Sequence, residues 1–76
     1  MTVFPNPAFN AITISCSEPI LLISLADISG KKSLQQKGDN NNSTTLDLTN
    51  LKTGIYVLSI ATKSGVRTER IVKKDN

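Results

Sequence analysis

The fold of this chain is decided by the stretch Leu51-Lys52-Thr53-Gly54-Ile55-Tyr56-Val57-Leu58-Ser59-Ile60. Beyond the glycine, Tyr56, Leu58 and Ile60 alternate with the residues between them, which is the period of a β-strand. Glycine takes up a positive φ at low cost, so we expect Gly54 to adopt one at the corner that leads into this strand. A tyrosine at such a corner of a β-sandwich buries its ring, and its hydroxyl bonds to backbone a few residues upstream. We therefore predict that Gly54 and Tyr56 form a structural corner between two sheets.

The rest of the chain contains further short strand patterns and no convincing helical period. Residues 11–17 alternate, with Ile12, Ile14 and Cys16 on the side expected to be buried. Residues 31–37 carry lysines and a single large apolar residue, which suits an edge strand. The strands that we expect are residues 3–4, 11–17, 20–28, 31–37, 43–48, 54–62 and 66–74. This pattern predicts an all-β fold, a seven-stranded, immunoglobulin-like β-sandwich with Greek-key connections.

A length of 76 residues allows one domain, residues 1–76. The only cysteine, Cys16, has no partner for an internal disulfide, and its strand pattern predicts a small buried core residue rather than a reactive thiol. The chain does not open with a basic region followed by an apolar one. Its longest apolar run, residues 20–23, is far too short to span a membrane, so we expect a soluble domain.

The composition argues against an enzyme and against a nucleic-acid binder. The chain has no histidine, which is the commonest general base and metal ligand, and its acidic residues lie on different predicted turns and faces. Residues 39–43 imitate the start of a calcium loop, but Thr44 and Asn50 stand where that loop needs glycine and glutamate. The net charge of +3 is mild, and aromatic residues for base stacking are scarce. We expect no catalysis, no metal, no cofactor and no nucleic-acid partner.

Two neighbouring strands are expected to share an uncharged outer face. If Ile23 and Leu25 face the core, then Ile20 and Leu22 face outward, and the corner strand likewise turns two apolar residues outward. Because a solvent-facing sheet surface normally carries charge, this face has two interpretations. It is either a modest apolar patch or a docking or self-association surface. The residues of this possible docking face are Ile20, Leu22, Ile55 and Val57.

Four segments follow one another along nearly the whole chain in a distinctive order. They are Phe4-Pro5-Asn6-Pro7-Ala8, residues 23–32 with Asp27-x-x-Gly30-Lys31, residues 46–56 with Leu51-x-x-Gly54-x-Tyr56, and Arg70-Ile71-Val72-Lys73-Lys74. Taken alone, the last segment is also typical of a strand end with solvated lysines. Together the segments resemble the C-terminal sorting domains of the type IX secretion system, and they favour its type A subgroup.

The resemblance implies a function that composition does not reveal. Such domains lie at the C-terminus of proteins secreted by Gram-negative bacteria. The cargo reaches the periplasm by an ordinary N-terminal signal, and the folded C-terminal domain then directs passage through the outer-membrane translocon. A sortase-like peptidase generally removes the domain and can join the cargo to the cell surface. This chain would be the non-catalytic sorting domain of a larger secreted protein, and its partners would be the translocon and the peptidase.

The resemblance also supplies expected site residues. Those expected to contact the export machinery are Arg70, Ile71, Val72, Lys73 and Lys74. Those that belong to the family motif and fix the path and junction of the chain are Pro5, Asn6, Pro7 and Gly30. An alternative function is a non-catalytic module for adhesion or carbohydrate binding, although sugar platforms need more aromatic residues than this chain has. A spacer domain is a third possibility, and it predicts that the C-terminus is dispensable.

Overall fold

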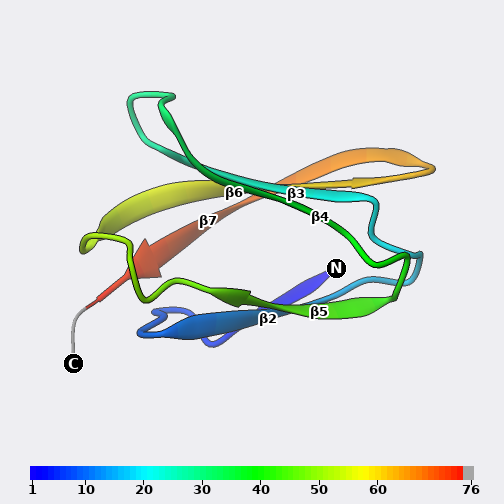
Figure 1. Ribbon diagram of the computed structural model, residues 1–76, viewed down its shortest axis with the longest axis horizontal. Coiled ribbons are helices and arrows are strands. Elements are labelled where there is room, and N and C mark those ends of the chain that lie inside the picture. Colours follow the sequence, from blue (N-terminus) through cyan, green and yellow to red (C-terminus); the bar gives the residue numbers. More distant parts are fainter. Residues whose placement is uncertain (75–76) are drawn as a thin grey trace.

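Two antiparallel sheets pack face to face in the computed structural model, which describes residues 1–74 (Figure 1). The strands are β1 (Thr2–Phe4), β2 (Ala11–Ser15), β3 (Leu22–Asp27), β4 (Lys32–Lys37), β5 (Ser43–Asp47), β6 (Gly54–Thr62) and β7 (Gly65–Lys73). One sheet has the order β1-β2-β5, and the other has the order β4-β3-β6-β7. The predicted all-β, two-sheet fold is therefore confirmed, and β4 is an edge strand, as its lysines predict. Residues 1–74 contain no helix with the length and apolarity needed to cross a membrane.

The core lies between the inner faces of the two sheets. Alternate strand residues point inward because successive side chains of a strand lie on opposite faces. The buried apolar residues are Ala8, Ile12, Ile14, Ile20, Ile23, Leu25, Leu46, Leu48, Tyr56, Leu58, Ile60 and Ile71. Cys16, predicted to be a small buried core residue, is only partly buried and packs against this core. It lies one residue beyond the end of β2, where its N–H donates to the Asn42 carbonyl, just before β5, at 2.7 Å.

The predicted corner is present at the start of β6. Tyr56 is 7% exposed, and its hydroxyl donates a 2.6 Å hydrogen bond to the carbonyl oxygen of Lys52. The expected positive φ at Gly54 is wrong, because the glycines with positive φ in the described chain are Gly30 and Gly65. A Cβ at Gly54 would meet only the Tyr56 ring, at an ordinary contact distance of 3.9 Å. The corner therefore depends on the tyrosine and its hydrogen bond, not on a special glycine conformation.

The prediction for residue 20 is also wrong. Ile20 was expected on the outer face of a strand, but it is fully buried, and β3 begins only at Leu22. The segment before β3 is irregular, since the Ile20 N–H donates to Asn41 and the Leu21 N–H donates to Ala61. This change of partner breaks the strict alternation, so Ile20 turns into the core and Leu21 is 42% exposed.

Candidate functional site: a clasp between the two ends of the chain

The segment that follows β1 lies along the outer edge of the C-terminal half of β7. Ala8 and Lys73 form a parallel bridge, although β7 is otherwise the last strand of its sheet. The Ala8 N–H donates to the Val72 carbonyl at 2.8 Å, and the Lys74 N–H donates to the Ala8 carbonyl at 2.8 Å. Ala8 is fully buried there. The proline-rich segment thus supplies backbone partners to a strand edge that would otherwise be open.

Asn6 extends this pairing with its side chain. Its Oδ1 accepts a 3.1 Å hydrogen bond from the Val72 N–H, and its Nδ2 donates a 3.2 Å hydrogen bond to the Arg70 carbonyl. A side-chain amide presents one acceptor and donors in the same arrangement as a peptide group, so it can replace backbone beside a strand. The flanking Pro5 and Pro7 have no N–H of their own to offer to the strand edge. The side-chain amide of Asn6 therefore supplies hydrogen bonds that the backbone of a neighbouring strand would otherwise make to β7.

These contacts join two segments that are more than sixty residues apart in the sequence. We call the joined structure the terminal clasp, and it consists of Asn6, Ala8, Arg70, Val72 and Lys74. The first and last motifs of the chain are therefore one site. From their sequences alone the two motifs were expected to have separate roles, as a junction and as a recognition strand. No local signal in the sequence predicts the contact.

The basic motif at the end of β7 is not uniformly exposed. Arg70 and Lys74 are exposed and Val72 is half-buried, whereas Ile71 is fully buried and Lys73 is only 3% exposed. The expectation of solvated lysines is therefore wrong for Lys73. The alternation of β7 turns Ile71 and Lys73 toward the opposite sheet, where Lys73 lies across from Gly54 and its Nζ donates to the Lys74 carbonyl at 3.2 Å.

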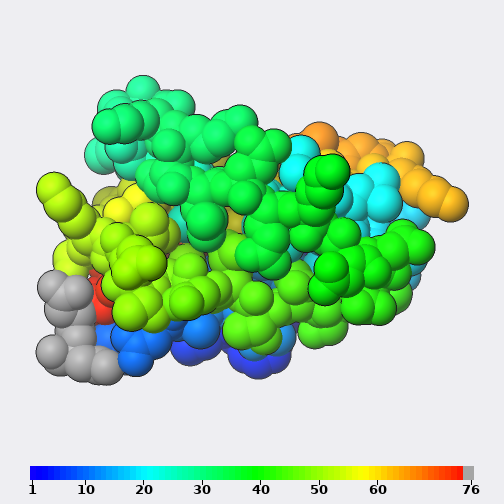
Figure 2. Space-filling view, in the orientation of Figure 1, coloured from blue at the N-terminus to red at the C-terminus, as the bar shows by residue number. Residues whose placement is uncertain are grey.

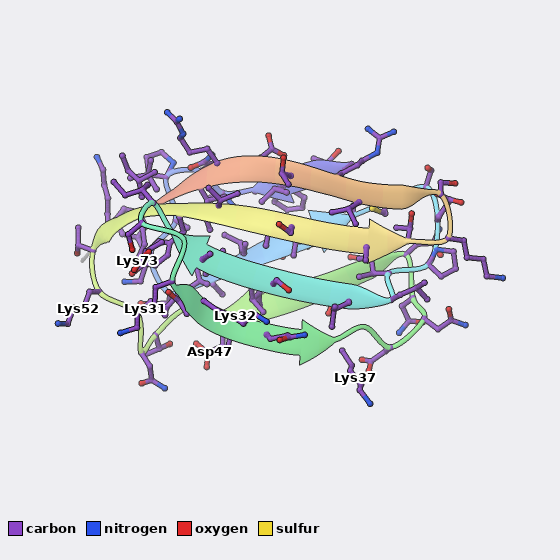
Figure 3. All side chains as sticks on the ribbon, turned by 90° about the horizontal axis from the view of Figure 1, so that it is seen from above. Lys31, Lys32, Lys37, Asp47, Lys52 and Lys73 are labelled. Carbon is purple, nitrogen blue, oxygen red and sulfur yellow. The ribbon has the colours of Figure 1, made fainter. Side chains whose placement is uncertain are left out.

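Lys73 lies at an end of the sandwich where several lysines gather. Figure 3 places Lys73, Lys31 and Lys52 at the same end, while Lys37 lies toward the other. A shallow pocket at the basic end is lined in part by three lysines, one carboxylate and the corner tyrosine: Lys31, Lys32, Lys52, Asp27 and Tyr56. The clasp therefore lies at an electropositive end of the molecule, beside the tyrosine corner.

The carboxylate of Asp27 stabilises the turn that contains the motif residue Gly30. Oδ1 of Asp27 accepts hydrogen bonds from the Ser29 hydroxyl at 2.6 Å, the Ser29 N–H at 3.0 Å and the Lys31 N–H at 3.0 Å. The Ser29 hydroxyl is the main reason that the pKa of Asp27 lies below its ordinary value. Gly30 has a φ of +93°, which favours glycine. Gly30 therefore has a structural role in this turn.

The outer face of β3 and β6 is uncharged, as the sequence predicts, but it contains fewer apolar residues than expected. The two strands are neighbours, with Leu22 opposite Ala61 and Ala26 opposite Val57. Ile55 is 40% exposed and Val57 is 36% exposed. Ile20 does not belong to this face because it is buried. Docking or self-association through this face stays a prediction.

Within residues 1–74 no group of three or more histidine, cysteine, aspartate or glutamate side chains could hold a metal ion. The clasp and its surroundings offer backbone groups, an amide and cations. Such groups bind another chain through hydrogen bonds and charge, and they include no activated nucleophile with its base.

A family model described as the secretion system C-terminal sorting domain matches residues 2–74. The match spans both partners of the clasp, from the segment with Asn6 to Lys74. The searches of curated proteins and of solved structures give no significant match. The resemblance inferred from the motifs is thus confirmed, and the chain belongs to the family of secretion system C-terminal sorting domains.

Proposed function

We propose that this domain is the C-terminal signal that directs an attached cargo protein through the type IX secretion system, across the outer membrane, after transit through the periplasm. Membership of the sorting-domain family supports a type IX secretion signal and a cargo that is exported to the cell surface or secreted. The domain itself acts as a label without catalysis. A sortase-like peptidase would remove it afterwards and attach the cargo to the surface.

The terminal clasp is the observation that carries this proposal. It brings the first and last family motifs to one place and exposes Arg70 and Lys74 beside the proline segment. Pro5, Asn6 and Pro7 are exposed as well. A partner could therefore contact both motifs at once, and only when the domain is folded. Recognition of the clasp would let the machinery distinguish a folded sorting domain from an unfolded chain.

The burial of the five residues in the basic motif suggests two roles, contact with a partner and support of the strand. We propose that Arg70, Val72 and Lys74 contact the machinery directly. Ile71 and Lys73 hold the strand from inside, because their side chains are turned toward the opposite sheet. The basic end with Lys31 and Lys52 would add long-range attraction for an acidic partner surface.

We further propose that the two sheets form an immunoglobulin-like Greek key. The pairings β2–β5 and β3–β6 join strands that are not consecutive, as in that topology. The fourth strand lies beside β3 here. This arrangement brings the start and the end of the chain together, which the clasp requires.

The function is tested with a reporter that carries an export signal and ends in residues 1–76, in a bacterium with this secretion system. The double variant Arg70→Glu with Lys74→Glu changes only exposed side chains of the clasp. Lys37→Glu with Lys63→Glu is the matched control, since both residues are exposed and lie outside the clasp. We expect the first pair to leave the reporter in the periplasm and the control pair to permit surface delivery.

Equal surface delivery from both charge variants would refute direct recognition at the clasp. Unchanged delivery after removal of residues 70–76 would refute the sorting function altogether. That deletion needs a folding control, because loss of half of β7 can unfold so small a domain. Circular dichroism of the purified charge variants shows whether they keep the strand content of the original domain.

A further inference from the structure

The outer edge of β7 is covered along only part of its length. β7 is the last strand of its sheet, and the clasp pairs with it from the Arg70 carbonyl onward. On the side away from β6, residues 66–69 and the Arg70 N–H have no partner strand within residues 1–74. Figure 2 shows the β6–β7 hairpin projecting beyond the rest of the molecule. The sandwich therefore presents a short, open strand edge.

The hydrogen bonds of the clasp show which backbone groups of β7 point away from β6. The N–H and C=O of Val72 both point away from β6, because they bond to Asn6 and Ala8. In an antiparallel ladder every second residue points the same way, so Thr68 and Val66 also direct their N–H and C=O groups outward. The N–H of Arg70 points outward too. An open edge with such groups is a template for another strand.

We propose that a second copy of this chain pairs with this edge, β7 against β7, antiparallel and centred on Thr68. Each Thr68 would exchange both backbone hydrogen bonds with the Thr68 of the other copy. The same register sets Arg67 of one copy opposite Glu69 of the other, and it does so twice by symmetry. A strand with both charges in this spacing is complementary to itself, which a two-fold interface requires.

The side chains at this register suit the pairing. Arg67 and Glu69 are exposed even though they lie on the inner side of β7, so both are available to a partner. Directly opposed residues of a pair that does not exchange backbone hydrogen bonds are the closest, and opposite charges there are stabilising. On the other side, Val66, which is 66% exposed, would lie against the aliphatic part of Arg70.

The length of the open edge selects this register. The hairpin turn ends the open edge before residue 66, and the clasp ends it at the Arg70 carbonyl. Thr68 is the middle of that interval. A shift of two residues in either direction would push one strand against Asn6 and Ala8 or leave outward groups unpaired.

The opposite edge of the sheet lacks this complementarity. The charged residues of β4 are Lys32 and Lys37, so no register of β4 against itself brings opposite charges together. Lysines on an edge discourage pairing. The two edges therefore predict different behaviour, with self-association at β7 and none at β4.

Edge-blocking prolines test the proposal. Thr68→Pro removes an outward N–H and spares the ladder with β6, so the domain should stay folded. Gln35→Pro is the matched control on β4. Its N–H also points outward, because Gly38 donates inward to Leu21 and the direction alternates along the strand. Sedimentation velocity up to millimolar concentration should show a dimer for the original chain and for Gln35→Pro, and a monomer for Thr68→Pro.

A charge exchange tests the register. Arg67→Glu and Glu69→Arg should each weaken the dimer about tenfold, because each replaces two attractive pairs by two repulsive ones. The double variant R67E/E69R restores opposite charges and should recover the original affinity. A double variant that is no tighter than the single variants would overturn the proposed register.

Cysteine cross-linking gives an independent measurement. In a Cys16→Ser background, a mixture of Arg67→Cys and Glu69→Cys chains should form a disulfide between unlike chains much faster than either chain alone. A chain that stays monomeric at millimolar concentration overturns the proposal. So does a dimer that Thr68→Pro leaves intact, since another surface, such as the outer face of β3 and β6, then holds it. Loss of surface delivery by Thr68→Pro in a monomeric chain would instead assign the edge to a strand of the export machinery.

Discussion

The two halves of β7 have the same alternation but very different surroundings. Ile71 and Lys73 in the second half are buried, whereas Arg67 and Glu69, which point to the same side in the first half, are exposed. The difference accompanies the clasp, which covers the edge of the second half from the Arg70 carbonyl onward, whereas the first half leads into the β6–β7 hairpin at the outer end of the molecule (Figure 1). A strand pattern thus gives the direction of each side chain, and the neighbouring elements decide its burial.

Removal of a side chain should give the largest difference in stability between the two halves of β7. Ile71→Ala should lower the free energy of unfolding by about 2–5 kcal/mol, because it removes a fully buried side chain and leaves a cavity. Val66→Ala, in the exposed half, should cost less than about 0.5 kcal/mol. Urea denaturation followed by circular dichroism measures both. If Ile71→Ala unfolds the domain outright, Ile71→Val, with an expected cost of about 0.5–1.5 kcal/mol, keeps the comparison measurable.

Loss of the Asn6 side chain from the clasp should have the next largest effect on the free energy of unfolding. Asn6→Ala leaves the Val72 N–H and the Arg70 carbonyl without their partner and should cost about 1–2 kcal/mol. Asn10→Ala, an exposed asparagine whose side chain has no hydrogen bond described in residues 1–74, serves as the matched control. Equal denaturation midpoints for the two variants would show that the amide of Asn6 does not stabilise the strand edge.

The corner tyrosine supports the same half of β7 from the neighbouring strand. Tyr56 lies opposite Ile71 in the ladder, and its hydroxyl bonds to the Lys52 carbonyl. Tyr56→Phe keeps the ring and removes only that hydrogen bond, so we expect a loss of about 1 kcal/mol by urea denaturation. A loss as large as that of Ile71→Ala would mean that the hydroxyl does more than pin the corner.

The smallest expected effect is a dependence of stability on acid pH. Hydrogen bonds hold the pKa of Asp27 below its ordinary value, chiefly that from Ser29, and Thr49 does the same for Asp47. A carboxylate with a lowered folded pKa stabilises the fold above its unfolded pKa of about 3.9, and that stability is lost as the pH falls through the folded pKa. Ser29→Ala should raise the pKa of Asp27 in a carbon-13 NMR titration. An unchanged pKa would contradict the role of the serine.

Much of the fold follows from the sequence, because it rests on local patterns. The bounds of β6, the edge position of β4, the neighbours β3 and β6, and the tyrosine hydrogen bond were predicted correctly. The turn at Gly30 was also predicted, since an aspartate side chain bonds to backbone two residues on and glycine accepts a positive φ. The buried face of each strand follows from alternation wherever a strand is regular.

The rest depends on contacts between distant segments. Ile20 was placed wrongly because the backbone changes partner just before β3, and alternation fails there. Lys73 was expected in solvent because lysine usually is, but the other sheet and the clasp enclose it. The contact of Asn6 with β7 joins the two ends of the chain, and only the three-dimensional arrangement reveals it.

Amide hydrogen exchange along β7 tests the clasp most directly. In dilute solution, where self-association is negligible, the Val72 and Lys74 amides should exchange slowly because they donate to Asn6 and Ala8. The outward amides of Val66 and Thr68 should exchange rapidly, and Asn6→Ala should make Val72 exchange as rapidly as Thr68. If Val72 already exchanges as fast as Thr68 in the original chain, the two ends of the chain are not joined and the clasp does not exist in solution.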